Sequence, residues 1–323
     1  MAKQPRSLTG QVAAITGGGR GIGRATAQAF VREGVKVAIG DIDLATAQRT
    51  AEELGGQTIA LELNVTDRES FQSFLDGVES RLGPVDILVN NAGIMPLATF
   101  VEEDDATAHR QIDINLHGVL YGMKIALPGM QRRGRGHVVN LASMAGKVGF
   151  PGGATYCATK HAVVGVSEAV RQELRGSGVE ISIVMPGLVN TELTSGLGTA
   201  RGVKRVDPED VAEAIVQALK FPRFDVFVPK SAGYIQRLSA LLPRAAAEAV
   251  ARTLKADRVL TEIDGAQRRS YEDRAAHSEP GLEPEALPAA PAATRVHSAP
   301  EPVSEAPGNG AAEEQEQEVP AAS

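Results

Sequence analysis

The chain has 323 residues, of which 43% are hydrophobic and 23% are charged, a composition typical of a globular protein with a large core. A single cysteine excludes a disulfide framework, the lack of Trp argues against a stacking surface for single-stranded nucleic acid, and no apolar run is long enough to span a membrane. The net charge of −7 is concentrated at one end, because residues 277–323 carry nine Glu and one Arg, whereas residues 1–276 are nearly neutral.

Short apolar runs alternate with amphipathic segments over residues 1–230. This alternation predicts an α/β fold with a Rossmann-like, doubly wound parallel sheet, and a ligand site at the carboxyl ends of its strands. We expect seven strands, at residues 12–16, 36–41, 58–65, 85–93, 137–143, 180–187 and 225–229. We expect helices between them, at residues 21–33, 67–82, 104–132, 155–176 and 208–220.

The residues after the seventh strand predict a C-terminal helical extension and a tail. Two amphipathic helices, at residues 233–243 and 245–260, place Leu238, Leu241 and Leu242 on one face. That face either packs on the domain or, because arginines flank it, serves as a substrate lid or a membrane-surface patch. Residues rich in Pro, Ala and Glu follow and predict a disordered acidic tail. We therefore expect an α/β domain at residues 1–230, the extension at 231–276 and the tail at 277–323.

The stretch "TGGGRGIG" at residues 16–23 follows the first expected strand and holds five glycines in eight residues. Glycine loses more backbone entropy on folding than any other residue, so the stretch indicates a need for backbone without side chains. A glycine-rich turn from strand to helix lets the pyrophosphate of a dinucleotide approach the helix N-terminus. The spacing Gly17-x-x-x-Gly21-x-Gly23 differs from the G-x-G-x-x-G fingerprint, and a purely structural turn is the alternative.

Asp41 ends the second expected strand, 18 residues after Gly23, which is close to the offset of about 20 at which a carboxylate binds the adenosine ribose. A carboxylate there repels a 2′-phosphate, so NAD is favoured over NADP. Arg20, inside the glycine stretch, argues the other way, because a guanidinium can bind a phosphate. The alternative for Asp41 is a cap for the helix that begins near Asp43.

The stretch "ATYCATKHA" places Tyr156 and Lys160 four residues apart, on one face of an expected helix. A neighbouring ammonium lowers the pKa of a tyrosine, which makes the phenol a candidate general acid or base for an alcohol. Ser143 ends the fifth expected strand, where its hydroxyl can polarise a carbonyl oxygen. Asn115 lies inside a helix-like segment, where Asn is unfavourable unless its amide is used.

Residues 8–230, which hold these motifs in this order, resemble the short-chain dehydrogenase/reductase family. The glycine stretch is similar to the cofactor loop of that family, "NNAG" at 90–93 to its strand-four motif, and "PGLVNT" at 186–191 to its segment over the nicotinamide. The resemblance implies that the catalytic residues are Asn115, Ser143, Tyr156 and Lys160. It implies that the dinucleotide contacts include Gly17, Gly19, Arg20, Gly21, Ile22, Gly23, Asp41, Asn64, Val65, Asn91, Ala92, Gly93, Tyr156, Lys160, Pro186, Gly187, Val189 and Thr191.

The resemblance also implies a role for each catalytic position. Tyr156 would exchange the hydroxyl proton, while Lys160 would bind the nicotinamide ribose and lower the pKa of Tyr156. Ser143 would orient the substrate oxygen, and Asn115 would hold a water that links Lys160 to solvent. The chain departs from the family at Asn64, where Asp is common, although an amide can still bind adenine. A homodimer or homotetramer is implied, with the C-terminal extension as the feature that could change it.

We therefore expect an oxidoreductase that transfers a hydride between NAD(H) and a secondary alcohol or ketone. The loops at residues 93–100, 144–153 and 188–198 are apolar and offer little that binds a phosphate or a carboxylate, which favours a lipophilic substrate. One alternative is a non-catalytic dinucleotide-binding scaffold or regulatory protein. Another is an NADP-dependent reductase of an acyl-carrier substrate, which would need a basic patch such as Arg132, Arg133 and Arg135.

Other features of the sequence indicate packing or solvent exposure. Cys157 is interpreted as a small buried residue, and the six His show no spacing typical of a metal site. The basic stretch at residues 130–137 is interpreted as a solvated turn, so no nucleic-acid partner is expected. No secretory signal is visible at the N-terminus, and we expect a cytoplasmic protein whose extension could contact a membrane surface.

Overall fold

The computed structural model describes residues 4–198, 204–239, 241–253 and 258–276. The predicted acidic tail at residues 277–323 lies outside the described residues.

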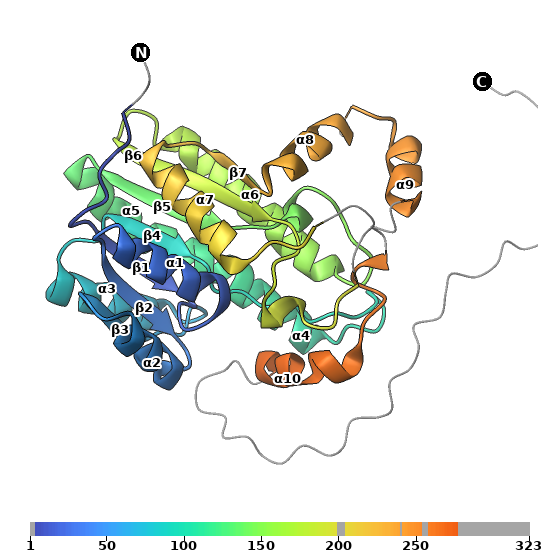
Figure 1. Ribbon diagram of the computed structural model, residues 1–323, viewed down its shortest axis with the longest axis horizontal. Coiled ribbons are helices and arrows are strands. Elements are labelled where there is room, and N and C mark those ends of the chain that lie inside the picture. The colour runs from blue at the N-terminus through green and yellow to red at the C-terminus, as the bar shows by residue number, and fades with distance from the viewer. Residues whose placement is uncertain (1–3, 199–203, 240, 254–257, 277–323) are drawn as a thin grey trace, which may run out of the picture. The chain divides into compact units, whose positions relative to one another are not determined.

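Seven parallel strands form one sheet, which confirms the predicted Rossmann-like α/β fold (Figure 1). The strand order is β3-β2-β1-β4-β5-β6-β7, so the direction of winding reverses between β1 and β4. In a doubly wound sheet the ligand crevice lies at that reversal, beyond the carboxyl ends of the strands. The strands are β1 Val12–Thr16, β2 Lys36–Asp41, β3 Thr58–Glu62, β4 Ile87–Asn90, β5 Gly136–Leu141, β6 Val179–Pro186 and β7 Asp225–Val228.

Helices cover both faces of the sheet, because its strands are apolar on both sides. Helices α1, α2 and α7 pack on one face, and α3, α5 and α6 pack on the other. Figure 1 shows α1 and α7 in front of the sheet. The helices of this region are α1 Gly21–Arg32, α2 Leu44–Leu54, α3 Arg68–Leu82, α4 Asp105–Ile112, α5 Gly118–Arg133, α6 Ala154–Glu173 and α7 Pro208–Lys220.

Two expected elements differ from the observed ones near the ligand crevice. Strand β3 ends at Glu62 rather than at residue 65, because the Oδ1 atom of Asn64 accepts a hydrogen bond from the Thr66 amide at 3.0 Å and turns the chain. The single helix expected at residues 104–132 is divided into α4, a π-helical turn at Asp113–His117, and α5. Both differences place predicted site residues in irregular backbone, Asn64 in a loop and Asn115 in the π-helical turn.

The C-terminal extension contains α8 Lys230–Ser239 and α9 Arg244–Thr253, near the two expected helices, and also α10 Gly265–Ala276, which was not expected. Helix α8 packs on the domain through Gly233, where an added Cβ would lie 2.5 Å from the Phe227 ring. The predicted apolar face points away from that contact, since Leu238 is 66% exposed and Leu241 is 82% exposed. Of the two alternatives for Leu238, Leu241 and Leu242, the one in which they pack on the domain is therefore wrong. None of the described helices is long and apolar enough to cross a membrane.

Candidate active site

The glycine loop between β1 and α1 forms a cradle that side chains would fill. A Cβ on Gly23 would lie 2.3 Å from the carbonyl oxygen of Gly17, and Gly17 and Gly21 have positive φ angles of 63° and 50°. No side chain caps the N-terminus of α1, so its first amide groups remain available to an anion. The loop therefore has the form that a pyrophosphate requires.

Asn91 and Ala92, which follow β4, fix the glycine loop through hydrogen bonds. The Asn91 amide group donates hydrogen bonds to the carbonyl oxygens of Thr16 and Gly17, both at 2.9 Å. The backbone amides of Asn91 and Ala92 both donate to the Thr16 hydroxyl at 3.0 Å. The strand-four motif thus fixes the glycine loop across the reversal point of the sheet.

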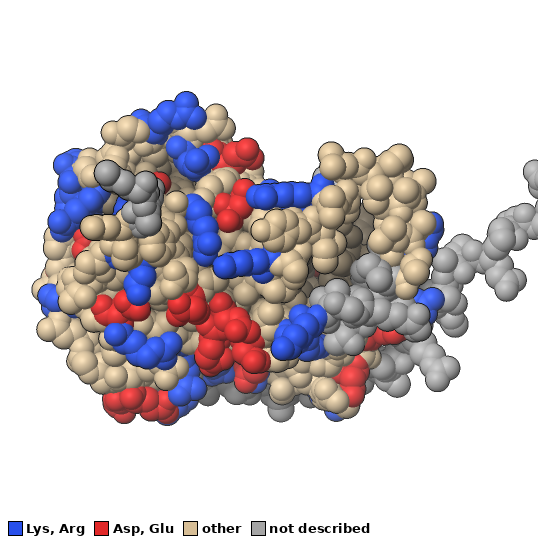
Figure 2. All heavy atoms as spheres, turned by 45° about the horizontal axis from the view of Figure 1, so that its top comes forward, with Lys and Arg blue, Asp and Glu red and all other residues tan. Residues whose placement is uncertain are grey.

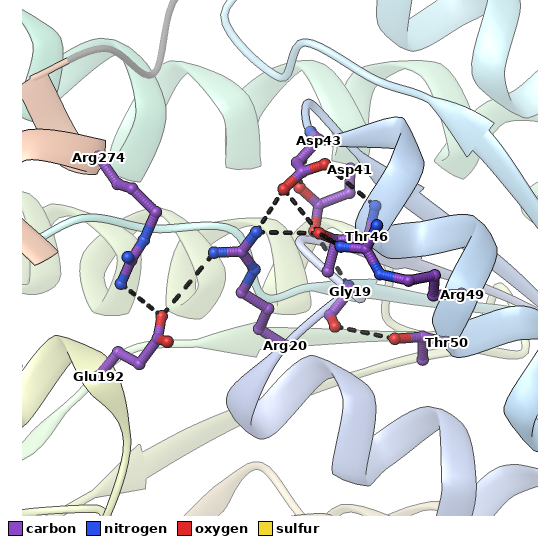
Figure 3. A network of polar contacts seen from close by, with 9 residues as sticks. All are labelled: Gly19, Arg20, Asp41, Asp43, Thr46, Arg49, Thr50, Glu192 and Arg274. Atoms are coloured by element: carbon purple, nitrogen blue, oxygen red, sulfur yellow. Dashed lines mark hydrogen bonds and ion pairs between the residues drawn. The ribbon is translucent and has the colours of Figure 1, made fainter. Parts of the chain in front are cut away.

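Asp41 lies at the carboxyl end of β2 and faces the same loop, as Figure 3 shows. Its Oδ2 accepts a hydrogen bond from the Gly19 amide at 3.0 Å, and its Oδ1 accepts one from the Asp43 amide at 3.1 Å. Burial raises the pKa of Asp41, although these two hydrogen bonds act against the rise. Asp43, not Asp41, caps α2, because its carboxylate accepts from the Thr46 amide at 3.0 Å. The alternative role of Asp41 as the helix cap is therefore wrong.

A cavity of about 940 Å³ runs from the glycine loop to the carboxyl ends of β3 and β4. Its lining includes twelve predicted dinucleotide contacts: Gly17, Gly19, Arg20, Gly21, Ile22, Asp41, Asn64, Val65, Asn91, Ala92, Gly93 and Thr191. Gly23, Tyr156, Lys160, Pro186, Gly187 and Val189 do not line it. The dimensions and the glycine cradle fit a dinucleotide, which the residues of this lining would hold.

Tyr156 and Lys160 lie together on α6, as their spacing predicts. The Lys160 Nζ atom lies 5.6 Å from the centre of the Tyr156 ring and donates to the Leu141 carbonyl at 2.9 Å. Burial lowers the pKa of Lys160 to about 8. Burial raises the pKa of Tyr156, more than a hydrogen bond with Ser143 lowers it. The pKa of Tyr156 is therefore raised rather than lowered as the spacing suggested, because desolvation outweighs the Ser143 hydrogen bond.

Asn115 is fully buried, and its side-chain amide is used within the protein. Its Oδ1 accepts from the Ile94 amide at 2.8 Å, and its Nδ2 donates to the Ile94 carbonyl at 2.9 Å and to the Thr159 hydroxyl at 3.2 Å. The π-helical turn directs this amide to the loop after β4, a use that π-helical turns often have at functional sites. The side chain thus joins the strand-four loop to α6, beside Lys160.

Helix α10 contributes residues that the sequence did not suggest. The Tyr271 hydroxyl accepts a hydrogen bond from the Met95 amide at 2.6 Å, and the Arg268 guanidinium donates to the Met95 and Leu193 carbonyls, the latter at 3.0 Å. Arg268 is fully buried, and its guanidinium lies 4.8 Å from the centre of the Tyr271 ring. The sequence of α10 is rich in arginine and has a single aromatic residue, a composition typical of a solvent-exposed helix, so it did not indicate these contacts.

Arg274 connects α10 to the mouth of the cavity. It forms an ion pair with Glu192 at 2.7 Å, and the same Glu192 oxygen lies 3.9 Å from the Nη1 atom of Arg20 in the glycine loop. Figure 3 shows these three side chains in a row. The C-terminal helix thus reaches the cofactor loop through one carboxylate.

The other sequence features lie away from this chemistry. Arg135 pairs with Asp86 at 3.2 Å at the amino end of β5, on the edge of the sheet opposite the cavity. Cys157 is buried beside Tyr156 and accepts a hydrogen bond from the Phe150 amide at 3.3 Å. Within the described ranges, no group of three or more His, Cys, Asp or Glu side chains could hold a metal ion.

Comparisons with known proteins agree with this geometry. The family model described as short chain dehydrogenase matches residues 11–202. Human estradiol 17-beta-dehydrogenase 11 is 30% identical over 247 residues, which cover 75% of this chain and 82% of that protein. Glycine betaine reductase of Emericella nidulans is 37% identical over 227 residues, which cover 67% of this chain but only 18% of that protein.

A solved structure shares the arrangement of elements. The short-chain dehydrogenase/reductase of Burkholderia phymatum, in complex with NAD, superposes with a TM-score of 0.68 and 26% sequence identity, covering 73% of this chain and 94% of that chain. The parallel sheet, the glycine cradle and the family match lead to one conclusion: this chain belongs to the short-chain dehydrogenase/reductase family of oxidoreductases, which use a nicotinamide dinucleotide.

Proposed function

We propose that the protein oxidises a lipophilic secondary alcohol, or reduces the corresponding ketone, with NAD(H) as its coenzyme. The observation that carries this proposal is the convergence of two sites at the carboxyl edge of the sheet. One is the dinucleotide cavity, and the other is the Tyr156, Lys160 and Ser143 cluster set in apolar surroundings.

Tyr156 is the group that moves the proton in this mechanism. In the oxidation direction, the phenolate oxygen of Tyr156 takes the proton of the substrate hydroxyl, and in the reduction direction the phenol returns it. Ser143, which hydrogen-bonds with Tyr156, orients the substrate oxygen. Lys160, while charged, stabilises the phenolate at a distance of 5.6 Å from the ring centre. The nicotinamide, when bound, supplies or accepts the hydride at the carbinol carbon.

The surroundings of Tyr156 support a lipophilic substrate. Tyr156 packs in a cluster with Met95, Cys157 and Leu197, and with Val259 and Leu260 from the segment before α10. This cluster offers dispersion and burial but few polar partners, so each apolar group of a substrate that enters it adds to binding. The two curated relatives bear names that refer to chemically different substrates, estradiol and glycine betaine, so they do not select a substrate for this chain.

A series of secondary alcohols of increasing chain length tests the proposal. With NAD present, we expect kcat/KM to rise by about fourfold for each added methylene until the cluster is filled. A polyol of equal length serves as the control and should react more slowly. Equal rates along the series, or a preference for the polyol, would contradict the lipophilic assignment.

The preference for NAD over NADP is supported by the position of Asp41. Its half-buried carboxylate lies beside the glycine loop, where it can accept hydrogen bonds from a ribose 2′-hydroxyl and repels a 2′-phosphate. Arg20, which the sequence offered as a phosphate ligand, is paired with Asp43. Both observations favour NAD.

We also propose peripheral contact with a membrane surface through α8 and the turn after it. Tyr234, Ile235 and Leu238 share one exposed face of α8, and Leu241 and Leu242 extend it. The same two helices carry cationic residues, Lys230 and Arg237 in α8 and Arg244 and Arg252 in α9.

Co-sedimentation with vesicles tests this contact. Leu238→Asp should reduce binding to anionic vesicles, whereas Phe221→Asp, at the far end of α7, should not. If Leu238→Asp changes the mass measured by light scattering but leaves vesicle binding unchanged, the exposed face of α8 is a subunit interface instead.

We also propose that the protein is cytoplasmic and forms a homodimer or a homotetramer.

A further inference from the structure

The region around Asp41 contains two arginines, Arg20 and Arg49, that meet at one hydroxyl group. The Nη2 atom of Arg20 donates to the Thr46 hydroxyl at 2.9 Å, and the Nη2 atom of Arg49 donates to the same oxygen at 2.6 Å. The Thr46 hydroxyl in turn donates to Asp43 at 2.7 Å. A hydroxyl has one donor and two acceptor positions, so this arrangement uses all three.

Asp43 is the anion that holds this arrangement together. Its Oδ2 atom pairs with the Arg20 guanidinium and accepts from the Thr46 hydroxyl, while its Oδ1 accepts from the Thr46 amide. Although partial burial works to raise the pKa of Asp43, hydrogen bonds from Thr46 and the charges of Arg20 and Arg49 outweigh burial and keep the pKa below its usual value. Asp43 therefore remains charged and neutralises the nearby arginines.

We propose that Asp43 is a second determinant of coenzyme choice, which withholds Arg20 and Arg49 from the 2′-phosphate of an NADP-type dinucleotide. The inference rests on the proposed preference for NAD. Asp41 acts directly on the ribose, whereas Asp43 acts through the two arginines and is thus a positioning residue. The two arginines and the two aspartates, Arg20, Arg49, Asp41 and Asp43, together carry no net charge. The group therefore exerts no net attraction on a phosphate dianion.

Removing the two carboxylates raises the net charge of these four side chains in two steps. Without the charge of Asp43, the cluster of four side chains gains one positive charge, and without the charge of Asp41 as well it gains two. Two guanidinium groups within reach of one another form the arrangement that binds phosphate through several hydrogen bonds. The chain therefore contains a latent site for a 2′-phosphate, and two substitutions of similar size should expose it.

The test compares the affinities of NADH and NADPH for the full chain and for Asp43→Asn, with the fluorescence of the bound nicotinamide as the readout. Asn also caps helices, so α2 should be retained. We expect Asp43→Asn to tighten NADPH binding by about tenfold and to change NADH binding by less than about threefold. Asp41→Asn/Asp43→Asn should bind NADPH more tightly than NADH.

Two further variants and one pair of small ligands make the test specific. Adding Arg20→Gln to Asp43→Asn should cancel the gain in NADPH affinity. Asp104→Asn is the matched control, because Asp104 caps α4 through a Thr107 amide at 2.9 Å, as Asp43 caps α2. The affinity for adenosine 2′,5′-bisphosphate relative to adenosine 5′-monophosphate should follow the same order, which excludes an effect at the nicotinamide.

The outcomes separate this inference from the proposed function. If the wild type prefers NADH but Asp43→Asn leaves the ratio of the two affinities unchanged, or if the gain survives Arg20→Gln, the inference is wrong and the proposed function stands. If the wild type binds neither dinucleotide, the proposed function and this inference both fail.

Discussion

The Oδ2 atom of Asp41 lies 3.0 Å from the backbone nitrogen of Gly19 and accepts its hydrogen bond. This contact joins the carboxyl end of β2 to the glycine loop, two segments whose sequence patterns predict binding of the same ligand. A side chain would be crowded there, since a Cβ on Gly19 would lie 3.0 Å from that same oxygen. The carboxylate that we propose for the ribose and the glycine loop that we propose for the pyrophosphate are therefore one structural unit.

Gly19→Ala should weaken NADH binding without unfolding the protein. The added methyl group displaces the Asp41 carboxylate, and we expect the affinity to fall by about tenfold, the equivalent of about 1.4 kcal/mol. Titration with NADH measures this change. Gly165→Ala is the control, because nothing lies within 4 Å of its added Cβ. Equal NADH affinities of the two variants would show that NADH binding does not depend on the observed position of the Asp41 carboxylate.

Tyr156→Phe should abolish turnover and preserve the fold. The variant loses only the hydroxyl that exchanges the proton, so kcat should fall by a factor on the order of 10² to 10⁴. Steady-state rates and NADH titration together check this prediction. Full turnover by Tyr156→Phe would refute the proposed proton-transfer role, and loss of NADH binding would show that the phenol serves the dinucleotide instead.

Arg268→Met should loosen α10 from the loop after β4. The substitution leaves the buried carbonyl groups of Met95 and Leu193 without their donor, and the cost should be on the order of 3 kcal/mol. Tyr271→Phe, which removes one hydroxyl, should cost only about 1 kcal/mol. Urea denaturation measures both. The neighbouring exposed Arg269→Met is the control, and a loss as large in that variant would contradict the account.

His137 should make the protein less stable as the pH falls. Burial, with a contribution from the charge of Arg6, lowers the pKa of His137 from 6.5 to about 3 in the folded state. Between those two values the unfolded chain binds a proton that the folded protein excludes, so the free energy of unfolding decreases with decreasing pH, by about 1.4 kcal/mol per pH unit.

The check is urea denaturation of the wild type and of His137→Gln at about pH 7 and about pH 5. The variant should show the smaller loss of stability between the two conditions, whereas His109→Gln, at an exposed helix position, should behave as the wild type. An equal loss in all three proteins would mean that His137 accepts a proton without unfolding.

The sheet and the dinucleotide cavity could be predicted because each follows from a local pattern. Apolar runs with intervening amphipathic segments specify buried parallel strands, and the glycines are needed where backbone approaches backbone, as at Gly23 and Gly17. The end of β3 could not be read from the same pattern. Leu63 and Val65 continue the apolar run, but the turn made by the Asn64 side chain stops the strand.

Helix α10 escaped prediction for a different physical reason. Its segment, "GAQRRSYEDRAA", has no apolar periodicity, and its position is determined by the buried Arg268 guanidinium and the Tyr271 hydroxyl. Such long-range polar contacts have no signature in a single sequence, because arginine is usually exposed. The apolar face of α8 was recognised, but the sequence could not reveal that it points to solvent.

The choice of coenzyme is measured by titration of the full wild-type chain with NADH and with NADPH, followed by the fluorescence of the bound nicotinamide. We expect NADH to bind at least about tenfold more tightly, because Asp41 repels a 2′-phosphate and Asp43 neutralises Arg20. Tighter binding of NADPH would contradict the assigned coenzyme, and binding of neither dinucleotide would contradict the proposed function itself.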